Sequence, residues 1–204
     1  MSVLAKTYSP SCVTPEQYLD RERAAEYKSE YLDGQIYAMA GAGRRHCLLS
    51  GSIAAQLAAQ FWSKPCEVYI GDMRVQADQS WQYFYPDVVV VCREPEFRDG
   101  REDTLLNPTV IVEVLSRSTE AFDRGEKFLR CRQMESLVEY LLVSQDEQRI
   151  EQFTRQDDGT WRLTETRETG AATLESIGCT LPLEDVYNKV TLEPRVRLTL
   201  DEPR

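Results

Sequence analysis

Two short stretches of the chain are apolar without any alternation of polar residues. Val88–Val91 is a run of four valines, and Val110–Leu115 is apolar at every position except Glu113. Strands that are apolar on both faces are typical of a sheet that is covered on both sides. The pattern therefore predicts two buried core strands. A carboxylate stands beside or inside each of them, because Asp87 directly precedes the valines.

Two helices are predicted in the N-terminal part of the chain. TPEQ at residues 14–17 has the form of a capping box with proline at the first helical position, and it predicts a helix that reaches about Tyr27. Further on, apolar residues recur every four positions from Leu49 to Phe61. This spacing predicts a second helix with one buried stripe.

Polar turns separate the other predicted elements. Residues 28–40 predict a hairpin with Asp33-Gly34 in a type I′ turn. Residues 66–78 alternate between apolar and polar positions, and they predict a strand that neighbours a second strand at 83–92, which includes the four valines.

The second half of the chain continues this mixture. Thr119 can cap a helix that reaches about Met134, and residues 139–144 and 149–155 predict two paired strands. Shorter strands follow, with one helical turn near residues 183–187. The order predicts an α/β (α+β) fold in which helices flank a mixed central sheet.

Length and composition are those of a globular protein. With 204 residues, of which 42% are hydrophobic, and roughly 150 residues per domain, we expect residues 1–204 to form one domain. Its appendages would be an N-terminal helix and hairpin (about 14–40) and a β-rich C-terminal extension (about 145–204). No apolar run approaches the ~20 residues of a membrane span. The N-terminus lacks the apolar core of a signal peptide, so we expect a cytoplasmic protein without membrane contacts.

The six cysteines are scattered along the chain and form no CxxC pair. Four of them lie in apolar or helical patterns. We therefore expect reduced thiols in the core rather than a disulfide or zinc framework. The residues are Cys12, Cys47, Cys66, Cys92, Cys131 and Cys179.

The net charge of −10 argues against a protein that coats nucleic acid without specificity. It leaves room for an enzyme with a local basic rim. From Ser116 to Met134 there are five basic and three acidic residues, which is a weak basic bias near the two core carboxylates.

Asp87 and Glu113 are the main candidates for chemistry. Acidic residues are almost never fully buried without a partner, so two of them on consecutive core strands suggest a shared one. If the strands are neighbours, both carboxylates can converge on one Mg²⁺, which takes one or two carboxylates together with waters and phosphate oxygens. The structural alternatives are a turn carboxylate at Asp87 and a buried ion pair at Glu113.

The same residues resemble a known family. Pro86-Asp87 followed by Glu113-Val114-Leu115 is similar to the PD-(D/E)-x-K nuclease superfamily, and most closely to the Uma-two family of restriction-endonuclease-like proteins. The resemblance extends to EYLDG (30–34), IVEVLSRSTEAFDRGEKF (111–128) and EYLLVSQDE (139–147). It implies a restriction-endonuclease-like core, Mg²⁺ (or Mn²⁺) as cofactor, DNA as substrate and a homodimer.

One residue departs from the superfamily pattern. The lysine that belongs two positions after the glutamate is replaced by Leu115. The resemblance implies that Lys127 has taken its place from the following helix, where Asp123, Lys127 and Arg130 share one face. The alternative for Lys127 is an ion pair with Asp123. The superfamily often adds an acidic residue from its N-terminal elements, and Glu30 is the candidate; a cross-strand surface pair is its alternative.

The remaining candidates are contacts to substrate phosphates. His46, the sole histidine, begins the second helix, where it is either structural or a phosphate contact. Asp72 is a further carboxylate, for which a strand-edge position is the favoured interpretation. The arginine candidates are Arg44, Arg45, Arg117, Arg124 and Arg130.

The predicted function is metal-dependent hydrolysis of DNA by Asp87, Glu113, Lys127 and Glu30, with Asp87 and Glu113 as metal ligands. Two alternatives remain open. One is a nuclease fold that binds nucleic acid but has lost catalysis, which Leu115 would mark. The other is a Mg²⁺-dependent phosphoesterase that acts on RNA or nucleotides. A Ser/His/Asp or Cys/His hydrolase is disfavoured because no nucleophile elbow of the G-x-S-x-G kind is present.

Overall fold

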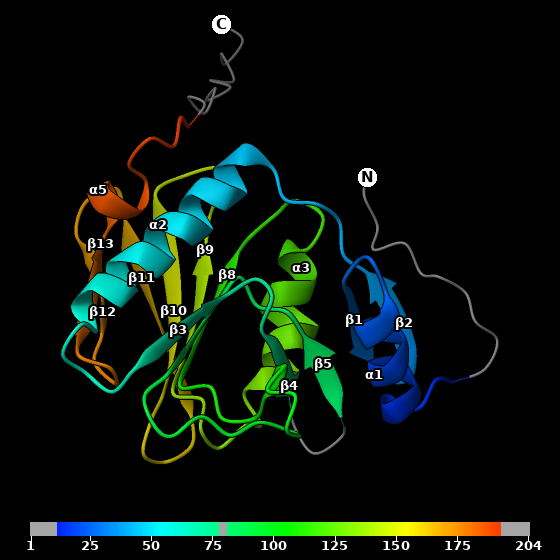
Figure 1. Ribbon diagram of the computed structural model, residues 1–204. Helices are drawn as coiled ribbons and strands as arrows, with labels where there is room; N and C mark the ends of the chain where they lie inside the picture. Colours follow the sequence, from blue (N-terminus) through cyan, green and yellow to red (C-terminus); the bar gives the residue numbers. More distant parts are fainter. Residues whose placement is uncertain (1–11, 78–80, 193–204) are drawn as a thin grey trace, which may run out of the picture.

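The structure is a computed structural model that describes residues 12–77 and 81–192. Within these residues the largest sheet has six strands in the order β11-β10-β9-β8-β6-β3 (Figure 1). Strands β8 and β9 are parallel and the other neighbours are antiparallel, so the sheet is mixed, as predicted. The strands are β3 (Glu67–Ile70), β6 (Val88–Val91), β8 (Val110–Val114), β9 (Glu139–Val143), β10 (Arg149–Arg155) and β11 (Trp161–Arg167).

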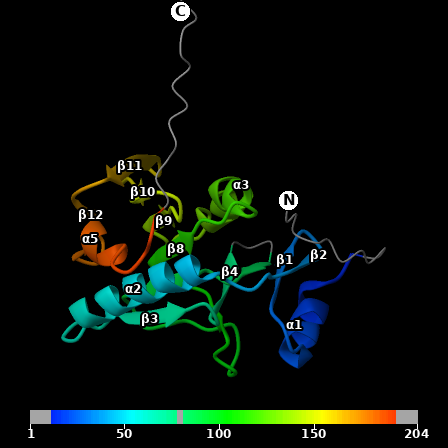
Figure 2. The same cartoon turned by 90° about the horizontal axis from the view of Figure 1, so that it is seen from above.

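Both faces of this sheet are covered. Helix α2 (Arg44–Gln60) buries its predicted stripe, including Leu49, Ile53 and Leu57, against Val88 and Val90 of β6. Alternate valines of β6 point to the opposite face, where they meet a second apolar cluster. Figure 2 shows α2 on one side of the sheet and the α3 region on the other. Double coverage explains why the valine run carries no polar alternation.

A second sheet joins the N-terminal elements to the centre, in the order β2-β1-β5-β4-β7. Helix α1 (Pro15–Ala24) packs beside it and begins with the predicted capping box of Thr14 and Gln17. Asp33 and Gly34 have φ values of 48° and 79°, which agree with the predicted type I′ turn. The strands are β1 (Ser29–Leu32), β2 (Gln35–Ala38), β4 (Arg74–Ala77), β5 (Gln82–Phe84) and β7 (Thr104–Leu105).

Two predicted strands are each divided between the two sheets. Residues 66–78 form β3 and β4, which are separated at Gly71, where φ is +33°; Asp78 lies outside the described residues. The segment at 83–92 is likewise divided between β5 and β6 by Pro86. The expectation of continuous strands was wrong at both points, because a positive-φ glycine and a proline without an N–H interrupt strand pairing. Asp87 consequently lies where the chain crosses from one sheet to the other.

The helix predicted from Thr119 is divided into three consecutive pieces. They are α3 (Glu120–Phe122), the π-helix η1 (Asp123–Lys127) and α4 (Phe128–Cys131). A π-helical turn is wider than an α-helical turn, and such turns occur frequently at functional sites. Asp123 and Lys127 are the buried residues of this turn.

The C-terminal part agrees with the predicted short strands. Strands β12 (Ala171–Leu174) and β13 (Cys179–Pro182) form a small hairpin, followed by the single turn of α5 (Leu183–Val186). Their apolar residues extend the core that lies beneath α2. No helix within the described ranges is both long enough and apolar enough to cross a membrane.

The cysteine prediction was wrong for four of the six residues. Cys66 and Cys92 form a disulfide, and Cys12 and Cys47 are exposed, which leaves Cys131 and Cys179 as buried thiols. The physical reason lies in the strand register. Glu67 of β3 pairs with Val91 of β6, so the residues just outside this pair, Cys66 and Cys92, stand opposite each other.

Candidate active site

The strands that carry Asp87 and Glu113 are antiparallel neighbours. Val88 of β6 pairs with Val112 of β8, and therefore Asp87 stands next to Glu113 across the strand pair. Oδ2 of Asp87 accepts a hydrogen bond of 2.7 Å from the backbone N–H of Val114. This bond fixes the carboxylate against β8.

The other oxygen of Asp87 contacts the first turn of α2. Nε2 of His46 lies 2.6 Å from Oδ1 of Asp87, and both side chains are 19% exposed. Because a carboxylate oxygen accepts, Nε2 of the imidazole is the donor. Asp87 is thus held at both oxygens, by a backbone amide on one side and by the imidazole on the other.

Lys127 lies between two carboxylates from different sheets. Its ammonium is 2.8 Å from Oε1 of Glu113 on β8 and 2.9 Å from Oε1 of Glu30 on β1. The side chain of Lys127 is only 4% exposed, and the two glutamates are nearly as buried. Glu30 also accepts a hydrogen bond from the backbone N–H of Tyr85. A buried charge is tolerated when it is paired in this way.

Burial and mutual repulsion shift the protonation equilibria of this cluster. Burial raises the pKa of Glu113, and the nearby carboxylates of Asp123 and Asp87 raise it further. Burial also raises the pKa of Asp123. Burial alone would lower the pKa of Lys127, but Glu113, Glu30 and Asp123 outweigh it and raise that pKa well above its ordinary value. Shifted groups that cluster in a cleft are typical of functional sites.

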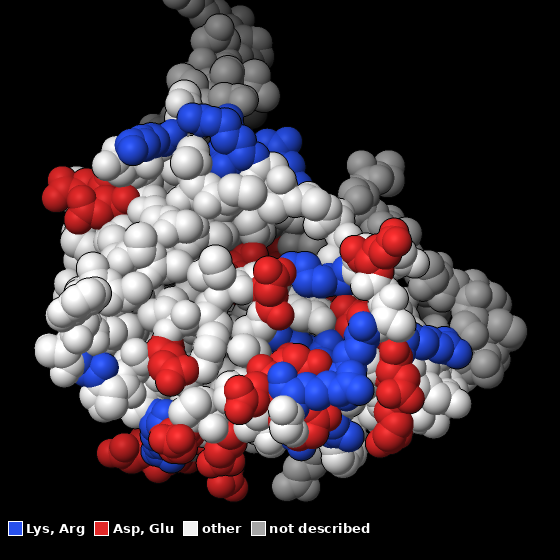
Figure 3. Space-filling model, in the orientation of Figure 1, with Lys and Arg blue, Asp and Glu red and all other residues white. Residues whose placement is uncertain are grey.

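These residues line one cleft of about 1590 Å³. It opens between the start of α2, the hairpin β1–β2 and the loop that follows β8. Figure 3 shows acidic and basic side chains mixed on this face rather than a continuous basic surface. The site residues that line the cleft are Glu30, His46, Asp87, Glu113, Asp123 and Lys127.

The arginine candidates fall into two groups. Arg45 and Arg117 line the cleft, as does Asp72, which forms an ion pair of 2.8 Å with Lys28 at the rim. Arg44 is exposed at the start of α2 and is not among the described residues that line the cleft.

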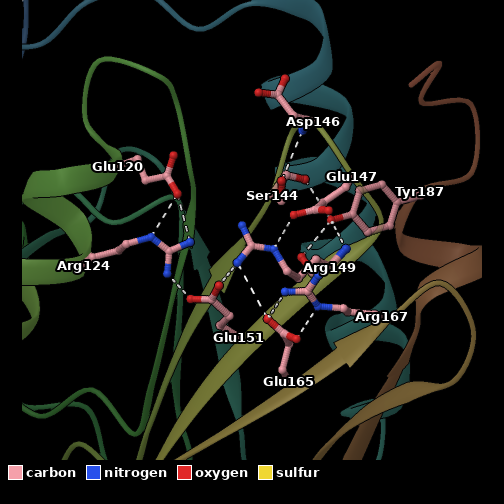
Figure 4. A network of polar contacts seen from close by, with 10 residues as sticks. All are labelled: Glu120, Arg124, Ser144, Asp146, Glu147, Arg149, Glu151, Glu165, Arg167 and Tyr187. Atoms are coloured by element: carbon pink, nitrogen blue, oxygen red, sulfur yellow. Dashed lines mark hydrogen bonds and ion pairs between the residues drawn. The ribbon is translucent and has the colours of Figure 1, made fainter. Parts of the chain in front are cut away.

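Arg124 and Arg130 are likewise absent from the described lining of the cleft. Arg130 contacts Asp33 and Glu126. Arg124 belongs to a network of ion pairs with Glu120 and Glu151 over β10 (Figure 4). Their guanidinium groups are therefore already engaged with carboxylates.

Several cleft residues were not among the predicted site residues. Asp123 adds a buried carboxylate beside Lys127, and its spacing of four residues from the lysine was the available signal. The backbone amide of Val114 and the side chain of Asp146 also face the cleft. No sequence pattern marks an amide donor, and Asp146 stands in a polar loop that resembles many others.

Asp87 and Glu113 have the donor chemistry that a divalent cation requires. Each oxygen of Asp87 accepts one hydrogen bond and keeps a further lone pair. Oε1 of Glu113 is in ion-pair contact with Lys127 but, among the described residues, accepts no well-aligned hydrogen bond. In the described part of the chain no three His, Cys, Asp or Glu side chains could hold a metal by themselves. A hard cation such as Mg²⁺, which takes one or two carboxylates together with water, is the kind of ion that these two residues could hold.

Known proteins resemble the chain in sequence. The pattern of the Uma2 (Uma-two) family, described as "Putative restriction endonuclease", matches residues 15–184. The chain is 38% identical to "Uncharacterized protein sll1609" of Synechocystis sp. (strain ATCC 27184 / PCC 6803 / Kazusa) over 165 residues, or 81% of this chain and 92% of that protein. It is 35% identical to "Uncharacterized protein slr1290" of the same organism over 184 residues, or 88% and 96% of the two chains.

A solved structure resembles the chain in fold. It is described as "Crystal structure of a putative nuclease belonging to DUF820 from Anabaena variabilis ATCC 29413", and it aligns with a TM-score of 0.72 over 86% of this chain and 97% of that chain. The sequences are 16% identical, so this likeness concerns the fold alone. The predicted restriction-endonuclease-like fold is confirmed.

Proposed function

Since the chain belongs to the Uma2 family of restriction-endonuclease-like nucleases, we propose that it is a metal-dependent endonuclease that hydrolyses DNA phosphodiester bonds. The observation that carries the proposal is the buried contact of Lys127 with Glu113 and Glu30, beside Asp87 and inside the cleft. A lysine in this position would take the place of the one that is missing two residues after Glu113, where Leu115 stands. Leu115 itself is buried in the apolar cluster on the α4 side of the sheet.

Asp87 and Glu113 would hold the cation, Mg²⁺ or Mn²⁺. When bound there, the cation would polarise the phosphate and lower the pKa of the attacking water. Asp87 is suited to this role because Val114 and His46 fix its orientation. His46 would then act as a positioning residue for Asp87 and not primarily as a phosphate contact.

Lys127 would act as a fixed positive charge. Its raised pKa keeps the ammonium protonated at neutral pH, so it would donate hydrogen bonds instead of removing a proton. It would orient the attacking water or stabilise the negative charge that develops on the phosphate. Glu30 would hold the ammonium in place from the second sheet.

The test is cleavage of plasmid and linear DNA with Mg²⁺ or Mn²⁺ by the wild type and by Asp87→Asn, Glu113→Gln and Lys127→Met. We expect metal-dependent cleavage that all three substitutions abolish while circular dichroism stays unchanged. Wild-type protein that binds DNA without cutting it would favour the first alternative, a nuclease fold that binds nucleic acid but has lost catalysis. Cleavage of RNA or nucleotides but not of DNA, in the same buffer, would favour the phosphoesterase.

The homodimer stays a prediction of the family resemblance, and the cytoplasmic location stays a prediction from the N-terminal sequence. A homodimer would place two such clefts against the two strands of a duplex, and sedimentation with and without DNA tests it. The expectation of a cytoplasmic protein is tested by fractionation of cells that express it.

A further inference from the structure

Three charged residues meet at the mouth of the cleft. Asp146, in the loop between β9 and β10, directs one carboxylate oxygen to each of two arginines. Oδ1 lies 3.9 Å from Arg45 of α2, and Oδ2 lies 3.4 Å from Arg117 in the loop after β8. All three residues line the cleft that contains Asp87 and Lys127.

Asp146 is separate from the neighbouring ion-pair network. In that network Arg124, Arg149 and Arg167 are matched by four glutamates, which are Glu120, Glu147, Glu151 and Glu165. Figure 4 shows the Asp146 carboxylate pointing away from these residues, and its backbone N–H donates to Oγ of Ser144. Its charge is therefore directed to the cleft and not to the network.

The contacts of Asp146 are exposed, in contrast to those of Lys127. The side chains of Arg45, Arg117 and Asp146 are 31%, 88% and 46% exposed. Exposed ion pairs of this kind contribute little to stability, so another anion can replace the carboxylate. Guanidinium groups bind carboxylates and phosphates through the same hydrogen-bond geometry.

We propose that Arg45 and Arg117 form a subsite for a phosphodiester of the substrate and that Asp146 occupies this subsite when no nucleic acid is bound. The inference rests on the proposed function and names one of its binding contacts. Asp146 acts as an internal competitor: a backbone phosphate must displace it from both arginines before it can enter. Removal of this charge should tighten binding, which is the opposite of the usual result of deleting a cleft residue.

The experiment measures binding of a short fluorescein-labelled DNA duplex by fluorescence anisotropy, in EDTA so that cleavage does not interfere. Asp146→Asn keeps the size of the side chain and removes its charge. Asp157→Asn makes the same change in net charge at an exposed turn that does not line the cleft. We expect about fivefold to tenfold tighter binding for Asp146→Asn, and a steeper dependence on salt by about one to two ions. Asp157→Asn should stay close to the wild type.

Two further variants test whether the tighter binding originates from the arginines. In the background Arg45→Gln with Arg117→Gln, the substitution Asp146→Asn should no longer tighten binding, as a mutant cycle requires for residues that interact. A gain that persists in this background would overturn the inference. The inference would also be overturned if Asp146→Asn bound DNA no more tightly than Asp157→Asn, or if neither variant bound DNA. In that case, a lowered melting temperature of Asp146→Asn would show that Asp146 stabilises the fold instead.

The two proposals fail in different measurements. If Asp146→Asn tightens binding through the arginines while no DNA is cut in Mg²⁺ or Mn²⁺, the catalytic proposal fails and the subsite stands. If DNA is cut but Asp146→Asn has no effect on binding, the subsite fails and the catalytic proposal stands.

Discussion

Nε2 of His46 lies 2.6 Å from Oδ1 of Asp87, and the same carboxylate accepts the backbone N–H of Val114 through Oδ2. The contact joins the first turn of α2 to the point where the chain crosses between the two sheets. It leaves Asp87 one orientation relative to Glu113. A hydrogen-bond partner of this kind typically fixes a ligating side chain before a metal arrives.

Loss of the imidazole should therefore weaken metal binding without loss of the fold. We expect His46→Ala to lower the affinity for Mn²⁺ by about 10-fold to 100-fold, since that is the usual cost of removing an outer partner of a ligand. Titration calorimetry measures it.

The matched variant is His46→Gln, whose amide N–H can still donate to Asp87. It should recover part of the affinity. If the alanine and glutamine variants bind Mn²⁺ as the wild type does, His46 does not position Asp87.

Substitution of Lys127 should reduce stability as well as activity. In Lys127→Met, Glu113 and Glu30 lose the ammonium between them and stay buried without compensation. Breaking a buried pair in this way typically costs about 3–5 kcal/mol. Urea unfolding at pH 8 and pH 5 measures the loss.

The direction of the pH dependence follows from the carboxyls. Burial already raises the pKa of Glu113, and without Lys127 that pKa rises further, so the folded variant binds more protons than the unfolded chain. The free energy of unfolding then falls as the pH rises. Arg162→Met, at an exposed position of β11, removes one positive charge as a control. Lys127→Met should therefore lose more stability at pH 8 than at pH 5, and equal losses at the two pH values would contradict this explanation.

The ionised carboxylate of Asp123 should destabilise the folded wild-type protein. Burial raises its pKa above the ordinary value of 3.8, so its ionisation costs the folded protein stability as the pH rises from that value through the raised pKa. Asp123→Asn cannot ionise. We expect its melting temperature to exceed that of the wild type by more at pH 8 than at pH 4.5, as followed by scanning calorimetry. A constant difference between the two pH values would mean that Asp123 does not titrate in this window.

The disulfide should contribute to stability under oxidising conditions. Cys66 and Cys92 join the ends of β3 and β6 and close a loop with a sequence separation of 26 residues. A disulfide of this kind typically contributes about 2–4 kcal/mol. We expect Cys66→Ser to lower the melting temperature and dithiothreitol to lower that of the wild type to the same value. Cys131→Ser provides a free-cysteine control, and its melting temperature should still respond to dithiothreitol.

The sequence placed Asp87 and Glu113 on two successive apolar strands, and their convergence depended on those strands being neighbours, as β6 and β8 are. Lys127 was placed near them by the family resemblance, and its spacing to Asp123 predicted only that the two share one helix face. The partners of Asp87 could not be found in this way. His46 is separated from it by 41 positions, and their contact depends on how α2 enters across the sheet. No pattern within a single segment predicts the angle at which α2 crosses the sheet.

Two other differences between the prediction and the structure have a signal in the sequence, but another pattern outweighed it. Gly71 and Pro86 interrupt the strands, but apolar residues stand on both sides of each of them, so each segment resembles one continuous strand. Cys66 and Cys92 stand at the far ends of two segments that were predicted to be neighbours, so an antiparallel register would have brought them together. The prediction of reduced thiols followed the general preference of isolated cysteines and left the strand register out of account.

The π-helical turn at Asp123–Lys127 stands between the α-helical pieces α3 and α4. In an α-helix each residue advances the direction of the side chains by about 100°. A π-helical turn holds one residue more than an α-helical turn, so the extra residue does not rotate the turns that flank it. Deletion of one residue here, such as Gly125, would restore an α-helical turn and leave Phe128 and Cys131 in the core. The additional residue therefore acts on the turn that carries Asp123 and Lys127, the two residues of this turn that line the cleft, and leaves the apolar contacts of α4 unchanged.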